Sequence, residues 1–329
     1  MSAAPVANEA LRQALARVAP GTALRDGIDR VVRAKMGALL VLSDEPAVLG
    51  ICSGGFLLDT DFTPQRLSEL AKMDGAIILS TDATRIARAN VHLVPHHTVP
   101  TSETGTRHRT AERVALSLGV PVVSVSEEMS VINVYAGGTK HQLHDIGRLL
   151  DRANQALQTL ERYKARLDDA TSALTALEIE DVVTIRDVAA VLQRGEMVRQ
   201  IADEIETMIV ELGVDARLLR LQLDEVFTSL DDELRLVAAD YPTIDASMAH
   251  TAADDAPASP RGLRLLSRVP RLGQPEAHAI AEHFGELSRL LRATVDDLAQ
   301  VPGIGRGTAA AVKETLERLT ETTILDQYI

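Results

Sequence analysis

The hydrophobic pattern of this chain changes at about residue 143, and that change limits the possible folds more than any other feature. Before it, short apolar runs typical of buried strands alternate with stretches of helical spacing. After it, apolar residues recur at steps of three, four and seven: Leu150, Ala153, Leu157, Leu160, Leu167, Leu174 and Leu177. We therefore expect an α/β or α+β domain with a central mixed sheet over residues 1–142, followed by an all-helical spine over residues 143–241.

The first 142 residues contain helix signals and strand signals in mixed order. Thr22 and Thr63 are placed to cap helices, and Pro64 suits a first helical turn. The predicted helices cover residues 9–18, 22–36, 65–72 and 111–118. The predicted strands cover residues 38–42, 48–52, 76–79, 91–94, 120–125 and 131–135. This order favours a mostly buried sheet with helices packed against it.

The chain of 329 residues is long enough for two or three domains. Further helices are expected over residues 185–212 and 215–239. Residues 242–260 are rich in Ala, Asp, Pro and Ser, so we interpret them as a flexible linker. Residues 261–329 are expected to form a small helical domain.

Composition narrows the classes of function. Apolar residues make up 46% of the chain but aromatic residues only 2%, which disfavours a stacking platform for single-stranded nucleic acid. The net charge of −13 confines any nucleic-acid binding to a local surface. Cys52 is the single cysteine, which fits a reducing cytoplasm. The sequence shows neither an apolar run of about 20 residues nor a signal peptide at the start. We therefore expect a cytoplasmic protein that does not contact a membrane.

A basic cluster stands where acidic residues are ordinarily favoured. Gly105-Thr106-Arg107-His108-Arg109-Thr110 precedes the predicted helix at 111–118, and a helix N-terminus carries partial positive charge. Free backbone N–H groups, two guanidinium groups and an imidazole at that point make a site for a polyanion such as a triphosphate. The alternative is a solvated basic helix end without a ligand.

Asp74-Gly75-Ala76 follows a predicted helix and begins a predicted strand, at an end of the sheet. A carboxylate there is suited to holding Mg²⁺ or Mn²⁺ against phosphate oxygens. By itself Asp-Gly is also an ordinary turn.

Val301-Pro302-Gly303-Ile304-Gly305 resembles the helix-hairpin-helix motif of DNA repair proteins. The glycines allow close approach of the backbone, and N–H groups at the next helix start bind a phosphate without reading bases. We therefore predict DNA contacts from Gly303, Ile304, Gly305, Arg306, Arg268 and Arg271. Arg261 and Arg264 belong to the same run of cations. Val269-Pro270-Arg271-Leu272-Gly273 is a degenerate copy of the motif. The alternative is a helix–helix turn in a protein–protein module.

Two histidine sets are candidate metal ligands: His92, His96 and His97, and His141 with His144. The second pair has a spacing that fits one helical face. Neither set has an accompanying ligand cluster in the sequence, so ordinary surface histidines are the preferred interpretation.

Taken together, the Asp-Gly-Ala and Arg-His-Arg motifs resemble those of the diadenylate cyclase domain, and the domain order is similar to that of DNA-integrity-scanning diadenylate cyclases. The resemblance implies condensation of two ATP molecules to cyclic di-AMP between facing protomers of a homo-octamer, with branched DNA lowering the activity. It assigns the metal to Asp74 and catalysis to Asp74, Arg107, His108 and Arg109. It assigns ATP binding to these residues and to Gly75, Ala76, Leu93, Thr106, Thr110 and Ser126. Many members have two arginines where this chain has Glu128 and Met129.

Two other functions compete with this interpretation. One is a catalytically idle nucleotide sensor on a DNA-scanning scaffold. The other is a DNA-repair nuclease or its accessory factor, although no carboxylate cluster for two-metal cleavage is visible.

Overall fold

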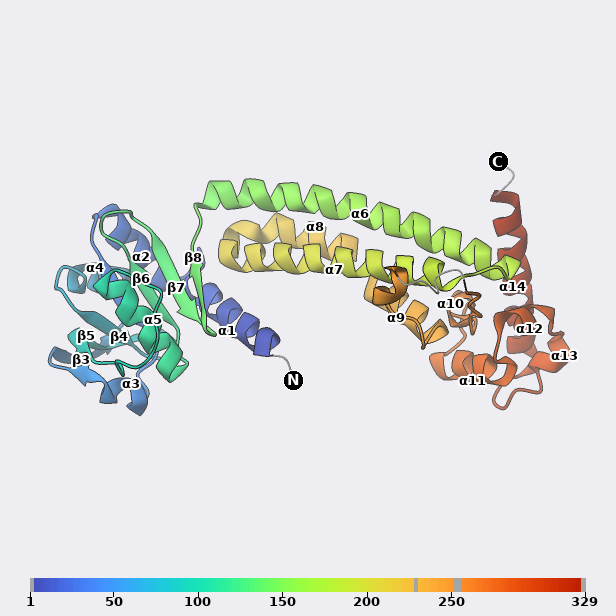
Figure 1. The fold of residues 1–329 in the computed structure, drawn as a ribbon, viewed down its shortest axis with the longest axis horizontal. Helices are drawn as coiled ribbons and strands as arrows, with labels where there is room; N and C mark the ends of the chain where they lie inside the picture. Colours follow the sequence, from blue (N-terminus) through green and yellow to red (C-terminus); the bar gives the residue numbers. More distant parts are fainter. Residues whose placement is uncertain (1–2, 228–229, 251–255, 327–329) are drawn as a thin grey trace. The chain divides into compact units, whose positions relative to one another are not determined.

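The computed structural model describes residues 3–227, 230–250 and 256–326 (Figure 1). It divides into two compact units, which are described separately below. The first unit comprises residues 1–154 and 205–220, and the second comprises residues 155–204 and 221–329. Within the described parts of the chain, no helix combines the length and apolar character needed to cross a membrane.

The first unit is built on an eight-stranded mixed sheet with the order β2-β5-β4-β1-β6-β7-β8, and β3 also pairs with β5. β1 and β4 are parallel, and the other described pairs are antiparallel. The bounds are β1 Ala38–Val41, β2 Cys52–Ser53, β3 Phe56–Asp61, β4 Ala76–Leu79, β5 Arg85–Leu93, β6 Val122–Val125, β7 Ile132–Ala136 and β8 Thr139–Gln142. The expected α/β domain with a central mixed sheet is confirmed.

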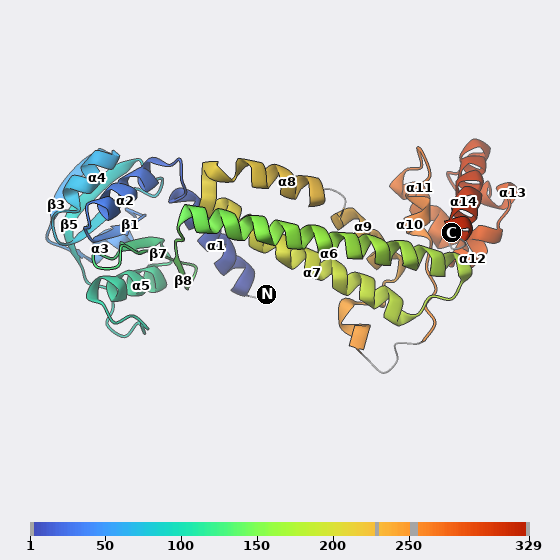
Figure 2. The same ribbon diagram turned by 90° about the horizontal axis from the view of Figure 1, so that it is seen from above.

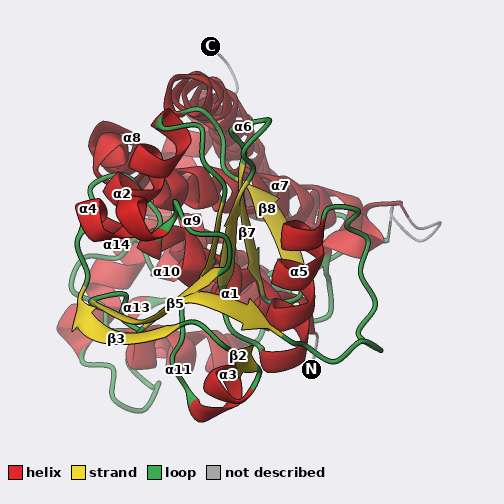
Figure 3. Cartoon of the chain, turned by 90° about the vertical axis from the view of Figure 1, so that its left-hand side faces the viewer, coloured by secondary structure: helices red, strands yellow, loops and turns green. Residues whose placement is uncertain are grey.

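Helices cover both faces of this sheet. Leu40 packs toward α1 (Ala3–Arg17), α2 (Ala23–Arg33) and α4 (Pro64–Leu70). Its neighbours Leu39 and Val41 point to the opposite face and pack against α5 (Thr106–Leu118) and α3 (Pro46–Gly50), because side chains alternate along a strand. Figure 3 shows α2 and α4 on one side of the strands and α5 on the other.

The predicted helix caps are confirmed, whereas several strands are not as expected. The side chains of Thr22 and Thr63 each accept a backbone N–H of the following turn, and Gly119 ends α5 at φ 69°. The strand predicted at 48–52 is wrong: Pro46 starts the one-turn helix α3 there, since so short an apolar run does not distinguish helix from strand. β3 and β8 were not predicted because their residues are mostly exposed.

The spine contains α6 (Ile146–Glu180), α7 (Ile185–Leu212), the 3₁₀ turn η1 (Gly213–Ala216), α8 (Arg217–Phe227) and α9 (Leu230–Asp240). Figure 2 shows α6 and α7 running beside each other. Of the predicted seam, Ala153, Leu157, Leu160, Leu167 and Leu174 are buried. The helix at 185–212 is confirmed, and the one expected at 215–239 is divided into α8 and α9.

Two hairpins organise the C-terminal helices of the second unit. These helices are α10 (Leu263–Leu266), α11 (Gln274–Phe284), α12 (Leu287–Arg292), α13 (Val295–Leu298) and α14 (Arg306–Asp326). In the motif at 301–305, Gly303 adopts φ 87°, which glycine tolerates without strain. Arg271 occupies the equivalent position of the degenerate copy and adopts φ 65°.

The segment predicted to be a flexible linker is ordered at both described ends. Residues 246–250 form the 3₁₀ turn η2, and residues 251–255 lie outside the described residues. Ala256 and Ala258 then pair with the start of α7: Ile185 N–H donates to the Ala256 carbonyl, and Ala258 N–H donates to the Val183 carbonyl. The second half of this segment is therefore held against the spine.

Arg264 does not belong to a phosphate-binding surface, contrary to the expectation from sequence. Its side chain is 5% exposed and its Nη1 lies 2.9 Å from Oε1 of Glu178. Its Nη2 donates to the Thr175 hydroxyl and the Thr171 carbonyl. The side chain is thus committed to holding α10 against α6.

Candidate functional site

A cavity of about 660 Å³ lies in the first unit beside the N-terminus of α5. It is lined by parts of β4, β5 and α5 and by the segment after β6. Its lining includes nine of the ten residues predicted to bind ATP: Asp74, Gly75, Ala76, Leu93, Thr106, Arg107, His108, Thr110 and Ser126. Residues from four separate sequence segments therefore meet at one cavity.

The cavity lies at the amino end of β4 and at the carboxyl ends of β5 and β6. Ala76 starts β4 opposite Val91 near the end of β5, and Val125 ends β6 opposite Ala38 at the start of β1. The segment before β4 and the segment after β6 reach the same edge because β1 is parallel to β4 and antiparallel to β6. This mixed sheet forms its ligand edge without the parallel-strand arrangement of doubly wound folds.

Arg107 is the cation that faces this cavity. Its Nη2 lies 3.7 Å from Oδ1 of Asp74, whose side chain is fully exposed. Its guanidinium also covers Gly37: a Cβ atom on that glycine would lie 2.1 Å from Nη1 of Arg107. The missing side chain at Gly37 therefore lets Arg107 reach Asp74.

Arg109 is placed differently from Arg107. It does not line the cavity in the described structure, and its Nη2 donates to the Thr104 carbonyl at 3.1 Å. Its Nε also lies 3.4 Å from the Glu103 carbonyl. Arg109 thus stabilises the loop before α5, and the two arginines of the motif have separate surroundings.

His108 is held from behind by polar side chains of the sheet. Its Nδ1 lies 2.7 Å from Oγ of Ser124 and 3.3 Å from the Tyr135 hydroxyl. Tyr135 donates to Glu103, which also pairs with Lys140 at 2.6 Å. Nε2 of His108 has no hydrogen-bond partner among the residues that the structure describes. The network therefore fixes the ring and leaves one nitrogen for a ligand.

Burial and neighbouring charge set the protonation of this network. Burial lowers the pKa of His108, and Lys140 and Arg107 lower it further against the opposing effect of Glu103. Burial by itself would raise the pKa of Glu103, but hydrogen bonds from Lys140 and Tyr135 lower it on balance. His108 is accordingly neutral near pH 7, with Glu103 ionised.

The first turn of α5 is open to an anion. It contains no acidic residue, and Gly105 at the N-cap provides no side-chain cap. Arg109 N–H is the first of the helix to find a backbone acceptor, the Gly105 carbonyl. The N–H groups of Thr106, Arg107 and His108 are thus available at the positive end of the helix dipole.

Some lining residues could not be recognised from the sequence. Asn90 lines the cavity with φ 54°, and a Cβ on Gly75 would lie 2.8 Å from the Asn90 backbone. Val91, His92, Glu127 and Glu128 also line the cavity. Of these, His92 had been noted as a possible metal ligand and Glu128 as a departure from the arginine of many family members. Asn90 and Val91 became recognisable only through the pairing of β4 with β5, and Glu127 only through its place after β6.

The second predicted site is the hairpin before α14. A Cβ atom on Gly303, Gly305 or Gly307 would meet no atom within 4 Å, so the backbone is open there. Arg268 and Arg271 are exposed, and Arg306 pairs with exposed Asp296. Ile304 is 6% exposed, and its N–H donates to the Val301 carbonyl. Ile304 therefore supports the hairpin from the core instead of presenting its side chain to a ligand.

Comparison with known proteins gives matches along nearly the whole chain. Residues 25–140 match the family described as DisA bacterial checkpoint controller nucleotide-binding, and residues 143–259 match the DisA bacterial checkpoint controller linker region. Residues 264–325 match the helix-hairpin-helix motif. The linker-region match includes most of 242–260, the segment that the sequence analysis interpreted as a flexible linker.

Curated relatives agree with these domain matches. A DNA integrity scanning protein DisA from Parafrankia sp. (strain EAN1pec) is 48% identical, covering 99% of this chain and 100% of the relative. The protein of that name from Frankia casuarinae is 49% identical with the same coverage. The one from Streptomyces coelicolor is 48% identical and covers 97% of this chain and 94% of the relative.

Proposed function

The chain belongs to the DNA integrity scanning (DisA) family of diadenylate cyclases, and we propose that it condenses two ATP molecules into cyclic di-AMP with release of two pyrophosphates. The observation that carries this proposal is the joint placement of Asp74, Arg107 and His108 on one cavity at a helix N-terminus. One chain carries one such motif pair, whereas the product contains two nucleotides. Two protomers therefore face each other, and we extend this to the homo-octamer expected from the family.

In this mechanism the ATP triphosphate lies at the start of α5. The free N–H groups of the first turn and the guanidinium of Arg107 bind phosphate oxygens. Thr106, Thr110 and Ser126 also line the cavity. We assign recognition of the adenine to the backbone near Leu93, whose side chain is 5% exposed. Arg109 acts by positioning the loop before α5, as its contacts with the carbonyls of 103 and 104 indicate.

The 3′-hydroxyl of one ATP attacks the α-phosphorus of the other, so that a P–O bond forms and pyrophosphate leaves. Charge accumulates on the leaving pyrophosphate, and Arg107 stabilises it. Ser124 holds the ring through Nδ1 of His108, so that Nε2 faces the phosphate oxygens of the bound ATP. The same reaction at the partner's cavity closes the ring.

Asp74 fits the divalent metal that the family requires. Its carboxylate is fully exposed at the cavity, and Mg²⁺ and Mn²⁺ are typically held by one or two carboxylates together with substrate phosphates. When bound, such an ion polarises the phosphate and lowers the pKa of the attacking hydroxyl. We propose Mg²⁺ or Mn²⁺ for this position.

The activity is tested by incubating the full chain with ATP and Mn²⁺ and identifying the product by mass spectrometry. Cyclic di-AMP with two equivalents of pyrophosphate is the expected result. ATP binding without turnover would instead support the idle nucleotide sensor.

Gly37→Ala is expected to weaken ATP binding by about tenfold or more, since the new methyl group displaces the Arg107 guanidinium and one charge-assisted contact is lost. Only the end of a flexible side chain must move, so the fold should persist. Calorimetry with a non-hydrolysable ATP analogue measures the effect. Gly50→Ala is the matched control, because a Cβ there meets no atom within 4 Å. Equal affinities of the two variants would contradict the role of Arg107.

We further propose that the hairpin at 301–305 binds DNA phosphates and that branched DNA lowers the cyclase rate. The open backbone at Gly303, Gly305 and Gly307 and the exposed Arg268 and Arg271 support phosphate contacts without base readout. Because Arg264 joins the hairpin helices to the spine, point variants are a better test than removal of residues 261–329.

Gly305→Glu is expected to weaken binding of a four-way DNA junction by about tenfold or more, because a carboxylate replaces open backbone where a phosphate would bind. Gly50→Glu brings the same charge into the first unit and should leave DNA binding unchanged. Mobility-shift titration gives the affinities, and cyclase rates with and without the junction give the regulation. If both variants bound the junction like the unchanged protein, the hairpin would not be the DNA site.

A further inference from the structure

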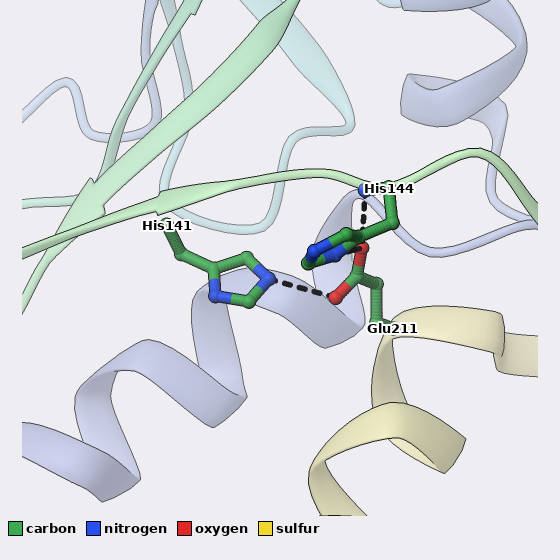
Figure 4. Close-up of side chains that lie close together, drawn as sticks. All are labelled: His141, His144 and Glu211. Atoms are coloured by element: carbon green, nitrogen blue, oxygen red, sulfur yellow. Dashed lines mark hydrogen bonds and ion pairs between the residues drawn. The ribbon is translucent and has the colours of Figure 1, made fainter. Parts of the chain in front are cut away.

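A second cluster of metal-type ligands lies in the first unit, away from the ATP cavity. His141 is in β8, His144 precedes α6, and Glu211 lies in the last turn of α7. Figure 4 shows both imidazoles beside the Glu211 carboxylate. Nε2 of His141 lies 2.7 Å from Oε2 of Glu211, and Nδ1 of His144 lies 3.2 Å from Oε1. The pair does not share a helical face, contrary to the expectation from spacing.

Glu211 has unusual surroundings for a carboxylate. Its side chain is only 4% exposed, and among the described residues its charged or ionisable neighbours are His141 and His144. Its Oε1 also accepts the His144 backbone N–H at 2.7 Å. A buried carboxylate needs a compensating positive charge. Either the imidazoles provide it by taking up protons, or a bound cation provides it.

The donor set is that of a transition metal and not of magnesium. One atom from each of the three residues lies within 4.8 Å of the other two. Two imidazole nitrogens and one carboxylate oxygen bind Zn²⁺ well, whereas Mg²⁺ prefers oxygen ligands alone. His144 has a side chain that is 45% exposed, which gives an ion access from solvent.

We propose that His141, His144 and Glu211 bind a divalent transition metal ion of the zinc class, with the remaining position open to water. The site joins β8 and the segment after it to the end of α7, so the ion ties the last strand of the sheet to a segment about 70 residues later. It is independent of the proposed cyclase chemistry, because none of the three residues lines the ATP cavity.

The test measures Zn²⁺ binding to the chelator-treated full chain by calorimetry, with Mg²⁺ in excess to occupy oxygen-only sites. The variant is His144→Ala, which removes the imidazole but keeps the backbone N–H that Glu211 accepts. The matched control is His96→Ala with His97→Ala, which removes a stacked histidine pair that lacks a nearby carboxylate ligand among the described residues. Glu211→Gln is a second variant. Absorption spectra with Co²⁺ report the ligand type.

We expect one Zn²⁺ per chain, a higher Tm with Zn²⁺, and an affinity at least about tenfold lower in His144→Ala, since loss of even an outer partner of a metal site costs that much. The control should bind like the unchanged chain. Equal Zn²⁺ affinity in His144→Ala and the unchanged chain, or loss of binding in the control, would overturn the proposal.

Discussion

Asp74→Asn is expected to lower cyclic di-AMP synthesis by at least about a thousandfold while the fold and ATP binding persist. The substitution keeps the shape of the side chain but removes the charge that holds the divalent ion, and metal stabilisation of a phosphoryl transition state contributes several kcal/mol. Because the Asp74 side chain is fully exposed, no buried contact is lost. Product formation by mass spectrometry and ATP-analogue binding by calorimetry separate turnover from affinity.

Asp59→Asn is the matched control for this prediction. Asp59 is an exposed aspartate of the same unit that pairs with Arg85 on the surface, outside the cavity. It should retain the full rate. If Asp74→Asn and Asp59→Asn made product equally fast, the assignment of Asp74 to the metal would be wrong.

Arg264→Met is expected to destabilise the second unit by about 3–5 kcal/mol, because it leaves Glu178 buried without its cation. The Glu178 side chain is 1% exposed and accepts from Tyr241 as well as from Arg264. Burial raises the pKa of Glu178, and Arg264 opposes that shift. Denaturant unfolding followed by circular dichroism measures the loss.

A lower pH should reduce the loss of folding stability that Arg264→Met causes. Without Arg264, the folded-state pKa of Glu178 rises further above its unfolded value. The folded state then binds the proton more tightly, so the variant gains stability as the pH falls through that pKa. Adding Glu178→Gln should recover part of the stability at neutral pH. Arg268→Met, at an exposed position four residues later, should change stability by less than about 0.5 kcal/mol. Equal effects at 264 and 268 would contradict the buried ion pair.

Local features of the sequence determined the helix caps and pointed to the candidate site residues of this protein. Thr22, Thr63 and Gly119 act within one turn of the chain, so their capping roles followed from residue type alone. The Asp-Gly-Ala and Arg-His-Arg motifs were recognisable because each is contiguous. The change of period near residue 143 likewise separated the sheet from the spine.

Long-range packing decided what residue type could not. Arg264 and Arg268 are equivalent in sequence, yet one is buried against Glu178 and the other is exposed. Arg107 and Arg109 share a motif, but only Arg107 lines the cavity, because it lies over Gly37.

The proposed metal ligands at Glu211 also could not be grouped from the sequence. Its partners His141 and His144 lie 70 and 67 positions away along the chain, so no spacing rule connects them. The exposed strands β3 and β8 carry no buried face to mark them, and they exist through pairing with β5 and β7. A sequence pattern shows the effect of a residue on its own helical turn or strand. The fold determines which distant residues share a buried site, because burial and charge compensation depend on neighbours that only the tertiary structure supplies.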